Sequence, residues 1–312
     1  MDRVSTINMS RADWLEARRS GIGGSDAATV VGLNPWASLY SLWADKTGRL
    51  PDKEDTEAMR IGRDLEDYVA HRFEEATGKA VRRRNAILRD PDKPWAHANI
   101  DREVIGERAG LECKTTNVLN LKMYKGGEFP DNYYCQCMHY LGVTGWDRWY
   151  LAVLVVGSGF FVFTLERDED EIAALMDAEK AFWNTFVLPD VAPEVDGTKP
   201  TSDAIGKVYA ASEGGKTAEI LTKKSDFEML DALKQQKKEL QTQIDAIENG
   251  IKEEMGTAET GNSQAGYRVT WKPQTRTTFD HKRFAKDHPE LDLEGYYKTS
   301  ASRVLRIKKE DN

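Results

Sequence analysis

The sequence contains few cysteines and no long hydrophobic run. Its 312 residues include three cysteines, none in CxxC spacing, which excludes a disulfide framework and disfavours a cysteine-only zinc or iron–sulfur site. The longest apolar stretch, residues 151–156 and 160–163, is broken by Gly-Ser-Gly and is shorter than the ~18 residues that span a bilayer. The first residues hold no apolar segment typical of a secretory signal. We therefore expect no membrane association and a reducing cytosol.

Basic residues are fewer than acidic ones and are concentrated near the C-terminus. The 44 basic residues are outnumbered by 52 acidic ones, which gives a net charge of −8. Residues 264–309 hold eleven Lys or Arg and five Asp or Glu, so this segment carries +6 and the remainder carries −14. Net acidity argues mildly against nucleic-acid binding, but segregated charge leaves a basic binding segment open. Hydrophobic residues make up 40%, which excludes wholesale disorder.

The hydrophobic periodicity predicts a mixed α/β domain over residues 1–190. Helices are expected at residues 10–20, 27–31, 38–48, 56–77, 131–143 and 168–187. Strands are expected at residues 80–90, 95–105, 109–116, 148–156 and 160–166, the last two forming a hairpin. The length allows one large domain with an appendage, or two domains.

The chain beyond residue 190 predicts a different organisation. Residues 191–216 contain proline, glycine and serine and are expected to form a linker with at most a short ordered patch. Residues 217–256 favour a helical hairpin or a short coiled coil, because apolar residues recur there at steps of three and four. Residues 257–312 are expected to form a basic, aromatic, β-rich module. This module either contacts nucleic acid or docks on the acidic domain with its aromatics as its own core.

The residues most indicative of chemistry lie on two expected strands. Asp101 follows Ile100, and Glu112-Cys113-Lys114 comes eleven residues later. Side chains alternate along a strand, so Glu112 and Lys114 share a face, and pairing of the two strands brings Asp101 near Glu112. Two carboxylates beside an ammonium, with the Cys113 carbonyl as a further oxygen, suit Mg²⁺ or Mn²⁺. A surface ladder of ion pairs is the alternative, although the apolar flanks favour a functional site.

Two further segments supply polar side chains that suit such a site. Glu66 follows an apolar position of the helix expected at 56–77, and it can reach the same metal directly or through water. Gln136 and Tyr140 share a helical face at i, i+4 and can bond phosphate oxygens or water. An exposed helix Glu and ordinary helix packing remain the alternatives for these residues.

An N-terminal segment has the character of an anion site. Trp14 and Arg18 precede a glycine-rich turn, and Ser25 is placed to cap the helix that follows. Arg18 adds a permanent charge with bidentate geometry for phosphate. A purely structural helix cap is the alternative interpretation.

Together these segments resemble the YqaJ-type viral recombinases, which form the lambda-exonuclease-like branch of the PD-(D/E)XK nuclease superfamily. The resemblance covers roughly residues 10–190. Its motifs, in family order, are Trp14-x3-Arg18-x2-Gly21-Ile22-Gly23-Gly24-Ser25-Asp26, Gly62-x2-Leu65-Glu66, Asp101, Leu111-Glu112-Cys113-Lys114 and Gln136-x3-Tyr140. One departure is Ile100, which stands where the family name has proline.

The resemblance implies a PD-(D/E)XK restriction-endonuclease-like core, with a central mixed sheet flanked by helices. It implies a Mg²⁺-dependent 5′→3′ exonuclease on double-stranded DNA ends that leaves 3′ single strands for a single-strand-annealing recombinase partner. Trimeric rings in lambda-like relatives imply homo-oligomerisation, and the host setting would be the bacterial cytosol, with the protein encoded by a phage or prophage.

The resemblance also assigns roles to individual residues. Asp101 and Glu112 would be metal ligands, Lys114 would position the attacking water, and Glu66 would be the helix carboxylate of the site. Gln136 and Tyr140 would support these groups. The DNA 5′-phosphate would be held by Arg18 and Ser25, with Trp14 beside them. Another PD-(D/E)XK nuclease, either an endonuclease or RecB-like, and a non-catalytic DNA-end-binding protein are the competing hypotheses.

Overall fold

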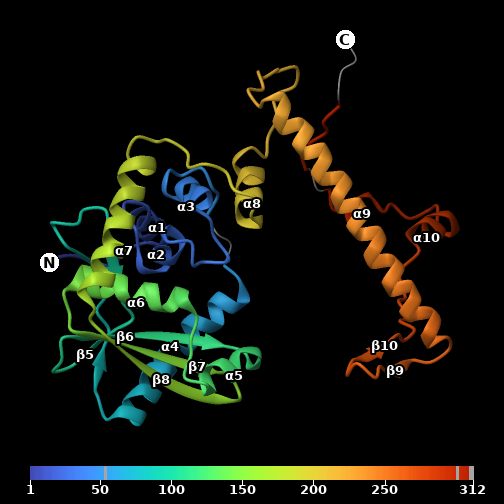
Figure 1. Cartoon of the computed structure of the whole chain (residues 1–312). Coiled ribbons are helices and arrows are strands. Elements are labelled where there is room, and N and C mark those ends of the chain that lie inside the picture. Colours follow the sequence, from blue (N-terminus) through green and yellow to red (C-terminus); the bar gives the residue numbers. More distant parts are fainter. Residues whose placement is uncertain (53–54, 300–301, 309–312) are drawn as a thin grey trace. The chain divides into compact units, whose positions relative to one another are not determined.

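A computed structural model describes residues 1–52, 55–299 and 302–308 of the chain (Figure 1). The chain forms two compact units. The first unit contains Met1–Ser212 together with the C-terminal residues from Ser302, and the second contains the described residues between 213 and 299. Among the described residues, no helix is both long and apolar enough to cross a membrane.

A five-stranded mixed sheet forms the centre of the first unit. Its strand order is β2-β5-β6-β7-β8, with β6 and β7 parallel and the other neighbours antiparallel. A smaller antiparallel sheet has the order β1-β3-β4. The strands are β1 (Asp2–Ser5), β2 (Val81–Arg82), β3 (Ala86–Arg89), β4 (His97–Asn99), β5 (Arg102–Val104), β6 (Ala109–Thr116), β7 (Arg148–Val155) and β8 (Gly159–Glu166).

Helices cover both faces of this central sheet. The helices of the first unit are α1 (Arg11–Arg19), α2 (Gly24–Val30), α3 (Leu39–Lys46), α4 (Glu57–Thr77), α5 (Leu121–Lys125), α6 (Asp131–Thr144), α7 (Glu169–Phe182) and α8 (Lys199–Val208). Short helical turns also occur at Val118–Asn120 and Trp183–Val187. Phe73 of α4 packs with Leu111 and Tyr150 on one face, whereas Leu141 of α6 packs with Leu151 on the other. The predicted fold class is confirmed.

The strands of the N-terminal half are shorter than the sequence predicted. Residues 80–90 and 95–105 each divide between the two sheets instead of forming one strand. The second break falls at Asp101, whose carboxylate Oδ2 accepts a hydrogen bond from the Cys113 amide at 2.7 Å. The side chain of Asp101 therefore replaces a backbone partner of β6 just before β5 begins.

The segment after α7 contains more structure than a linker. Helix α8 lies within residues 191–216, and its Thr201 and Ala204 are buried. Ala204 belongs to an apolar cluster with Tyr40 and Trp43 of α3, and the Thr201 hydroxyl donates a hydrogen bond to Ser38 at 2.7 Å. Burial of this amphipathic face keeps α8 in the first unit, although glycine and proline nearby indicate a loop.

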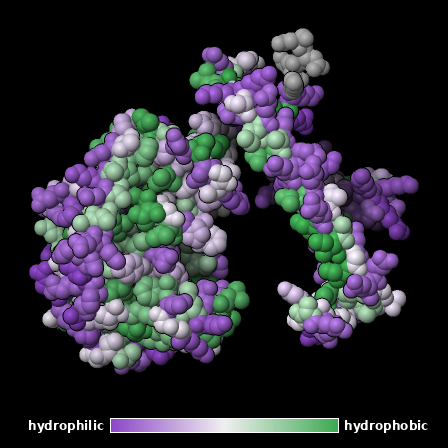
Figure 2. Space-filling view, in the orientation of Figure 1, coloured by the Kyte–Doolittle hydropathy of each residue, from purple (hydrophilic) through white to green (hydrophobic). Residues whose placement is uncertain are grey.

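The second unit is built on one unbroken helix rather than a helical hairpin. Its elements are α9 (Lys224–Met255), β9 (Thr260–Asn262), β10 (Arg268–Thr270), α10 (His281–Asp287) and a short turn at Glu294–Tyr296. β9 and β10 form an antiparallel hairpin. Leu233, Leu240 and Ile247 of α9 are exposed, and an apolar stripe follows this helix in Figure 2.

Candidate active site

The acidic residues of the site meet at the central strand β6. Glu112 and Lys114 lie on the α6 side of the sheet, whereas Cys113 packs toward α4. This alternation is the one that the sequence predicted. Asp101 directly precedes β5 and approaches β6 from there, and its carboxylate accepts a hydrogen bond from the Cys113 amide. The amide and the carbonyl of one residue in a strand face the same neighbouring strand. The Cys113 carbonyl therefore also points toward Asp101.

Glu112 is buried but only half satisfied by hydrogen bonds. Its Oε1 accepts hydrogen bonds from Lys114 Nζ at 2.5 Å and from Gln136 Nε2 at 2.7 Å. Its Oε2 is buried and has no hydrogen-bond partner among the described residues. Burial, followed by repulsion from Glu112 and Glu66, raises the pKa of Asp101 well above its usual range. The buried carboxylate of Glu112 and the half-buried carboxylate of Asp101 therefore form a pair with too little positive charge beside it.

Lys114 supplies one positive charge beside this pair. Its side chain is 22% exposed, and its Nζ lies 5.1 Å from the centre of the Tyr133 ring. Burial by itself would lower the pKa of Lys114, but Glu112 and Asp101 raise it above its ordinary value. Lys114 is therefore a permanent cation at neutral pH, suited to hold water or a phosphate oxygen rather than to abstract a proton.

A chain of hydrogen bonds connects Glu112 with the smaller sheet. Gln136 Nε2 donates to Glu112 and also to the Tyr140 hydroxyl at 2.9 Å, and that hydroxyl donates to the Asn99 carbonyl at 3.0 Å. The shared helical face of Gln136 and Tyr140 thus points at Glu112. Gly24 lies against this chain, because a Cβ there would come within 2.6 Å of the Tyr140 ring.

Glu66 is close to the acidic pair but is engaged by a neighbouring cation. Its Oε1 accepts a hydrogen bond from Arg102 at 2.5 Å, and Arg102 also bonds Asp67 at 2.6 Å. The guanidinium of Arg102 is almost completely buried, with 4% of its side chain exposed. Arg102 is thus a residue that sequence reasoning missed, and its position directly after Asp101 was the available signal.

The three residues expected at a phosphate site come together around the glycine-rich turn. Arg18 donates to the Ser25 hydroxyl at 3.0 Å, and its guanidinium carbon lies 4.8 Å from the centre of the Trp14 ring. The prediction that Ser25 caps α2 is wrong. Gly23 is the residue before the helix, and its amide donates to Asp26 at 3.0 Å, which leaves the Ser25 hydroxyl to Arg18.

A buried lysine connects Arg18 with α2 and α3. Lys46 Nζ donates to Asp26 Oδ2 at 2.6 Å and to the Arg18 carbonyl at 3.0 Å. Only 2% of the Lys46 side chain is exposed. Burial opposes the charge of Asp26, but Lys46 and Arg18 hold the pKa of this carboxyl well below its usual range. Sequence reasoning missed Lys46 because nothing in the α3 pattern distinguishes it from a surface lysine.

A pocket of about 160 Å³ joins the phosphate residues to the acidic pair. We call it the central pocket; its walls are formed by Trp14, Arg18, Gly23, Gly24, Ser25, His97, Asn99, Asp101, Glu112, Gln136 and Tyr140. The predicted anion site and the predicted acidic site are therefore two ends of one cavity. His97 and Asn99 are lining residues that the sequence did not single out.

The acidic end of this pocket fits a hard divalent cation. Within the described residues, no group of three or more His, Cys, Asp and Glu side chains forms a metal site. Mg²⁺ is nevertheless commonly held by one or two carboxylates, with water and substrate phosphate completing its shell. The partnerless Oε2 of Glu112 and the raised pKa of Asp101 are the features that a bound cation would satisfy.

Comparisons with known proteins show which family this chain belongs to. Residues 13–147 match the model of the YqaJ-like viral recombinase domain. The chain is 42% identical over 287 residues to YqaJ, an uncharacterised protein of Bacillus subtilis (strain 168), covering 91% of this chain and 90% of that protein. The chain belongs to the YqaJ-like viral recombinase family. The matched residues of this family domain include Trp14, Arg18, Glu66, Asp101 and Glu112.

Solved structures are less similar to this chain. LHK-Exo, an alkaline exonuclease from Laribacter hongkongensis, is 23% identical with a TM-score of 0.48, covering 56% of this chain and 91% of that one. A phage-related exonuclease from Haemophilus somnus 129PT is 10% identical with a TM-score of 0.40, covering 54% and 95%. These two likenesses are too remote to assign a reaction to this YqaJ-like chain.

Proposed function

We propose that this protein is a Mg²⁺-dependent 5′→3′ exonuclease that acts on double-stranded DNA ends and leaves 3′ single strands. The observation that carries the proposal is the central pocket. It places two carboxylates that lack neighbouring positive charge in the same cavity as an arginine–serine pair. The first pair suits a cation, and the second suits a terminal phosphate. Membership in a recombinase family agrees with such an activity.

The metal would be held by Asp101, Glu112 and the Cys113 carbonyl, with Mn²⁺ as a substitute for Mg²⁺. When bound, such a cation activates water and shields negative charge on the phosphate. Glu66 would act through water, because Arg102 already occupies its Oε1. Arg102 would thereby fix the distance of Glu66 from the metal ligands.

The remaining residues of the pocket orient the attacking water and the phosphate. Lys114, a permanent cation beside Glu112, would hold the water and stabilise the charge that develops on the phosphate oxygens. Gln136 fixes Glu112 Oε1 through a hydrogen bond, and Tyr140 fixes Gln136. The donor pair of Lys114 and Gln136 leaves Glu112 Oε2 free to face the cation.

The direction of degradation would follow from the other end of the pocket. Arg18 and Ser25 would bind a 5′-phosphate, and Trp14 keeps the guanidinium in place by stacking beneath it. A strand anchored there by its 5′ end presents its next phosphodiester toward Asp101 and Glu112. We propose that a single-strand-annealing recombinase receives the remaining 3′ strand in the cytosol of a bacterial host, where this would be a phage or prophage protein. Ring-shaped trimers would add processivity.

Purified protein with Mg²⁺ and linear duplexes tests the reaction. We expect degradation of linear DNA with a 5′-phosphate, slower degradation without it, and none of a closed circle. Lys114→Ala should lower the rate about 100- to 1000-fold, as loss of a transition-state donor does. Lys125 is exposed and does not line the central pocket, so Lys125→Ala removes the same charge and should not change the rate. Cleavage of the circle would indicate an endonuclease, and end binding without cleavage would indicate a non-catalytic protein.

The preference for 5′-phosphorylated ends tests the anchor separately. Arg18→Ala removes a charge-assisted contact worth about 1.5–3 kcal/mol, so the preference should fall ten-fold or more. Metal affinity should change less than this preference, because Arg18 lies at the other end of the pocket. An unchanged ratio of rates on phosphorylated and unphosphorylated ends would contradict the assigned polarity.

A further inference from the structure

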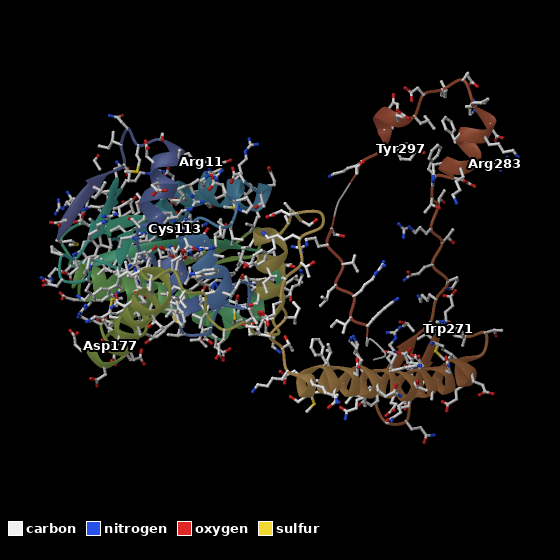
Figure 3. The ribbon with its side chains drawn as sticks, turned by 90° about the horizontal axis from the view of Figure 1, so that it is seen from above. Arg11, Cys113, Asp177, Trp271, Arg283 and Tyr297 are labelled. Carbon is white, nitrogen blue, oxygen red and sulfur yellow. The ribbon has the colours of Figure 1, made fainter. Side chains whose placement is uncertain are left out.

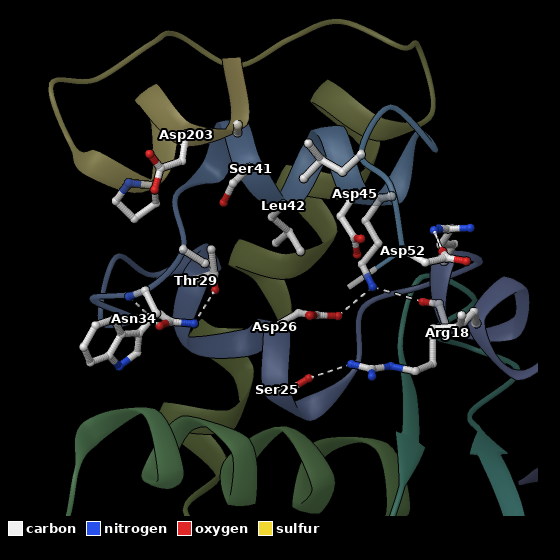
Figure 4. Close-up of a pocket in the computed structure, with 18 of the residues that line it drawn as sticks. Arg18, Ser25, Asp26, Thr29, Asn34, Ser41, Leu42, Asp45, Asp52 and Asp203 are labelled. Atoms are coloured by element: carbon white, nitrogen blue, oxygen red, sulfur yellow. Dashed lines mark hydrogen bonds and ion pairs between the residues drawn. The ribbon is translucent and has the colours of Figure 1, made fainter. Parts of the chain in front are cut away.

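A larger groove opens beside the central pocket and shares Trp14, Arg18 and Ser25 with it. Its volume is about 550 Å³ (Figure 4). The walls come from α1, the loop after α2, α3, the start of α4, and α8. We call it the α8 groove, because α8 lies outside residues 13–147 of the family domain and forms one wall of it.

The α8 groove is basic in an acidic chain. Seven cationic and four acidic residues line it, whereas the whole chain carries −8. Its cationic residues are Arg11, Arg18, Arg19, Lys46, Arg63, Lys199 and Lys207. Four of them, Arg19, Lys46, Arg63 and Lys199, have acidic partners at 2.5–2.6 Å. Arg11 and Lys207 have no ion-pair partner within 4.0 Å among the described residues, so their charge is available to a ligand.

An exposed aromatic side chain on a fixed loop accompanies these charges. Trp36 lines the α8 groove and is 84% exposed. Its amide donates to Asn34 Oδ1 at 3.0 Å, and Asn34 Nδ2 donates to the buried Thr29 at 2.9 Å, a bond drawn in Figure 4. The loop that carries Trp36 is therefore held to α2 by its side chains. An exposed tryptophan on a fixed loop is a ready stacking surface.

Cations with an exposed aromatic side chain are typical of sites for unpaired nucleic acid. Lysine and arginine follow the phosphates, while an aromatic ring stacks on a base that no longer stacks on its neighbours. Bases inside a duplex are covered on both faces and cannot use such a ring. We propose that the α8 groove binds an unpaired DNA strand, with Trp36 stacking on a base and Arg11 and Lys207 contacting phosphates.

This inference rests on the proposed exonuclease activity and adds a second strand to it. Removal of nucleotides from one strand at the central pocket leaves the complementary strand unpaired behind the advancing protein. The α8 groove opens from the same Arg18 and Ser25 that would hold the degraded strand. Binding the unpaired 3′-ended strand there would keep the two strands apart between successive cleavages.

Binding of a short oligothymidylate without a 5′-phosphate tests the groove independently of cleavage. The full-length protein is titrated in EDTA, and affinity is measured by fluorescence anisotropy of the labelled oligonucleotide. Trp36→Ala should weaken binding about 5- to 150-fold, the loss expected for one stacked base. Trp36→Phe should retain most of the affinity. Tyr68→Ala, an exposed aromatic of α4 outside the groove, should change nothing.

The salt dependence of the same binding tests the charged contacts. Lys207→Ala should reduce the slope of log K against log[salt] by about 0.7, the value for one single-strand phosphate contact. Lys125→Ala is the matched control and should leave the slope unchanged. Equal affinity of wild type and Trp36→Ala, or loss of affinity in Trp36→Phe equal to that in Trp36→Ala, would overturn the proposal.

Single-turnover cleavage separates this proposal from the proposed function. On linear 5′-phosphorylated duplex with Mg²⁺, Trp36→Ala should remove the first nucleotide at the wild-type rate and dissociate earlier on long substrates. If wild type does not cleave, the proposed function fails, yet the oligonucleotide titration still decides whether the groove binds DNA. A slow first cleavage in Trp36→Ala would instead place Trp36 in the central pocket and contradict a separate strand site.

Discussion

Asp101 is a half-buried carboxylate that lies beside the buried carboxylate of Glu112. Without a cation, the charge on Asp101 is unfavourable in the folded chain. Asp101→Asn removes this repulsion and can still accept the Cys113 amide. We expect the metal-free variant to melt at a higher temperature than the wild type while cleavage is lost. A lower melting temperature would show that the two carboxylates do not repel each other.

The pH dependence of this stabilisation follows from the raised pKa of Asp101. A carboxyl whose pKa is higher in the folded chain than the unfolded value of 3.8 binds more protons when folded. Its contribution to the free energy of unfolding therefore falls as pH rises through the window between these two pKa values. The gain in melting temperature from Asp101→Asn should be smallest at about pH 4 and grow as pH rises. A difference that is constant with pH would contradict the raised pKa.

Gly24 allows α2 to approach the hydrogen-bond chain behind Glu112. A Cβ at this position would lie 2.6 Å from the Tyr140 ring and 3.0 Å from Gln136 Cγ. Gly24→Ala should therefore displace Gln136, lower the cleavage rate, and cost about 1–3 kcal/mol of stability. Gly62→Ala is the control, because its Cβ would meet only Thr115 at 3.8 Å. Full activity of Gly24→Ala would mean that Gln136 does not position Glu112.

At the scale of elements, Lys46 connects three short helices around the phosphate residues. It is the last residue of α3, it pairs with Asp26 of α2, and it bonds the carbonyl of Arg18 in α1. Lys46→Met leaves Asp26 buried and unpaired, which should cost about 3–5 kcal/mol in urea unfolding. It should also reduce the preference for 5′-phosphorylated ends, because Arg18 and Ser25 lose their common support.

A double variant distinguishes charge burial from lost packing in this group. Asp26→Asn combined with Lys46→Met removes both charges, so its stability should recover most of the loss caused by Lys46→Met. The end preference should stay low, since Arg18 still lacks the bond from Lys46. Full recovery of the preference would show that Lys46 acts on Asp26 alone and does not position Arg18.

At the scale of the whole molecule, the second unit carries aromatic residues that are not buried in a core of their own. Tyr267, Trp271, Tyr296 and Tyr297 are exposed, and Figure 3 shows Trp271, Arg283 and Tyr297 outside any packed layer. Cys113, by contrast, lies among the dense side chains of the first unit in the same view. Exposed aromatics beside basic residues favour the hypothesis that this unit contacts nucleic acid over the hypothesis of a small β-rich core.

Removal of residues 217–312 tests the contribution of this unit together with the C-terminal residues from Ser302, which belong to the first unit. We expect lower duplex affinity and processivity at moderate salt and a smaller salt dependence, because several phosphate contacts are lost. The rate of the first cleavage at saturating protein should not change, since the central pocket lies in the first unit. An unchanged salt slope would identify the second unit as a docking or assembly module instead.

The sequence by itself determined the local elements and the main acidic cluster. Helix α4 ends at Gly78, β7 and β8 form a hairpin, and Glu112 and Lys114 share one face of β6, because each depends on spacing within a short segment. These features follow from periodicity, glycine stops and strand alternation. The same local patterns placed Gln136 and Tyr140 on one helix face.

Tertiary structure decided which residues from distant segments contact the site residues. Arg102 engages Glu66, Lys46 supports Arg18, and α8 forms a wall of a basic groove, and each of these contacts joins residues that are distant in the sequence. Burial determines which residues pair when they lie tens of residues apart along the chain. An isolated charge in the interior must find an opposite charge or a hydrogen bond wherever the packed elements present one.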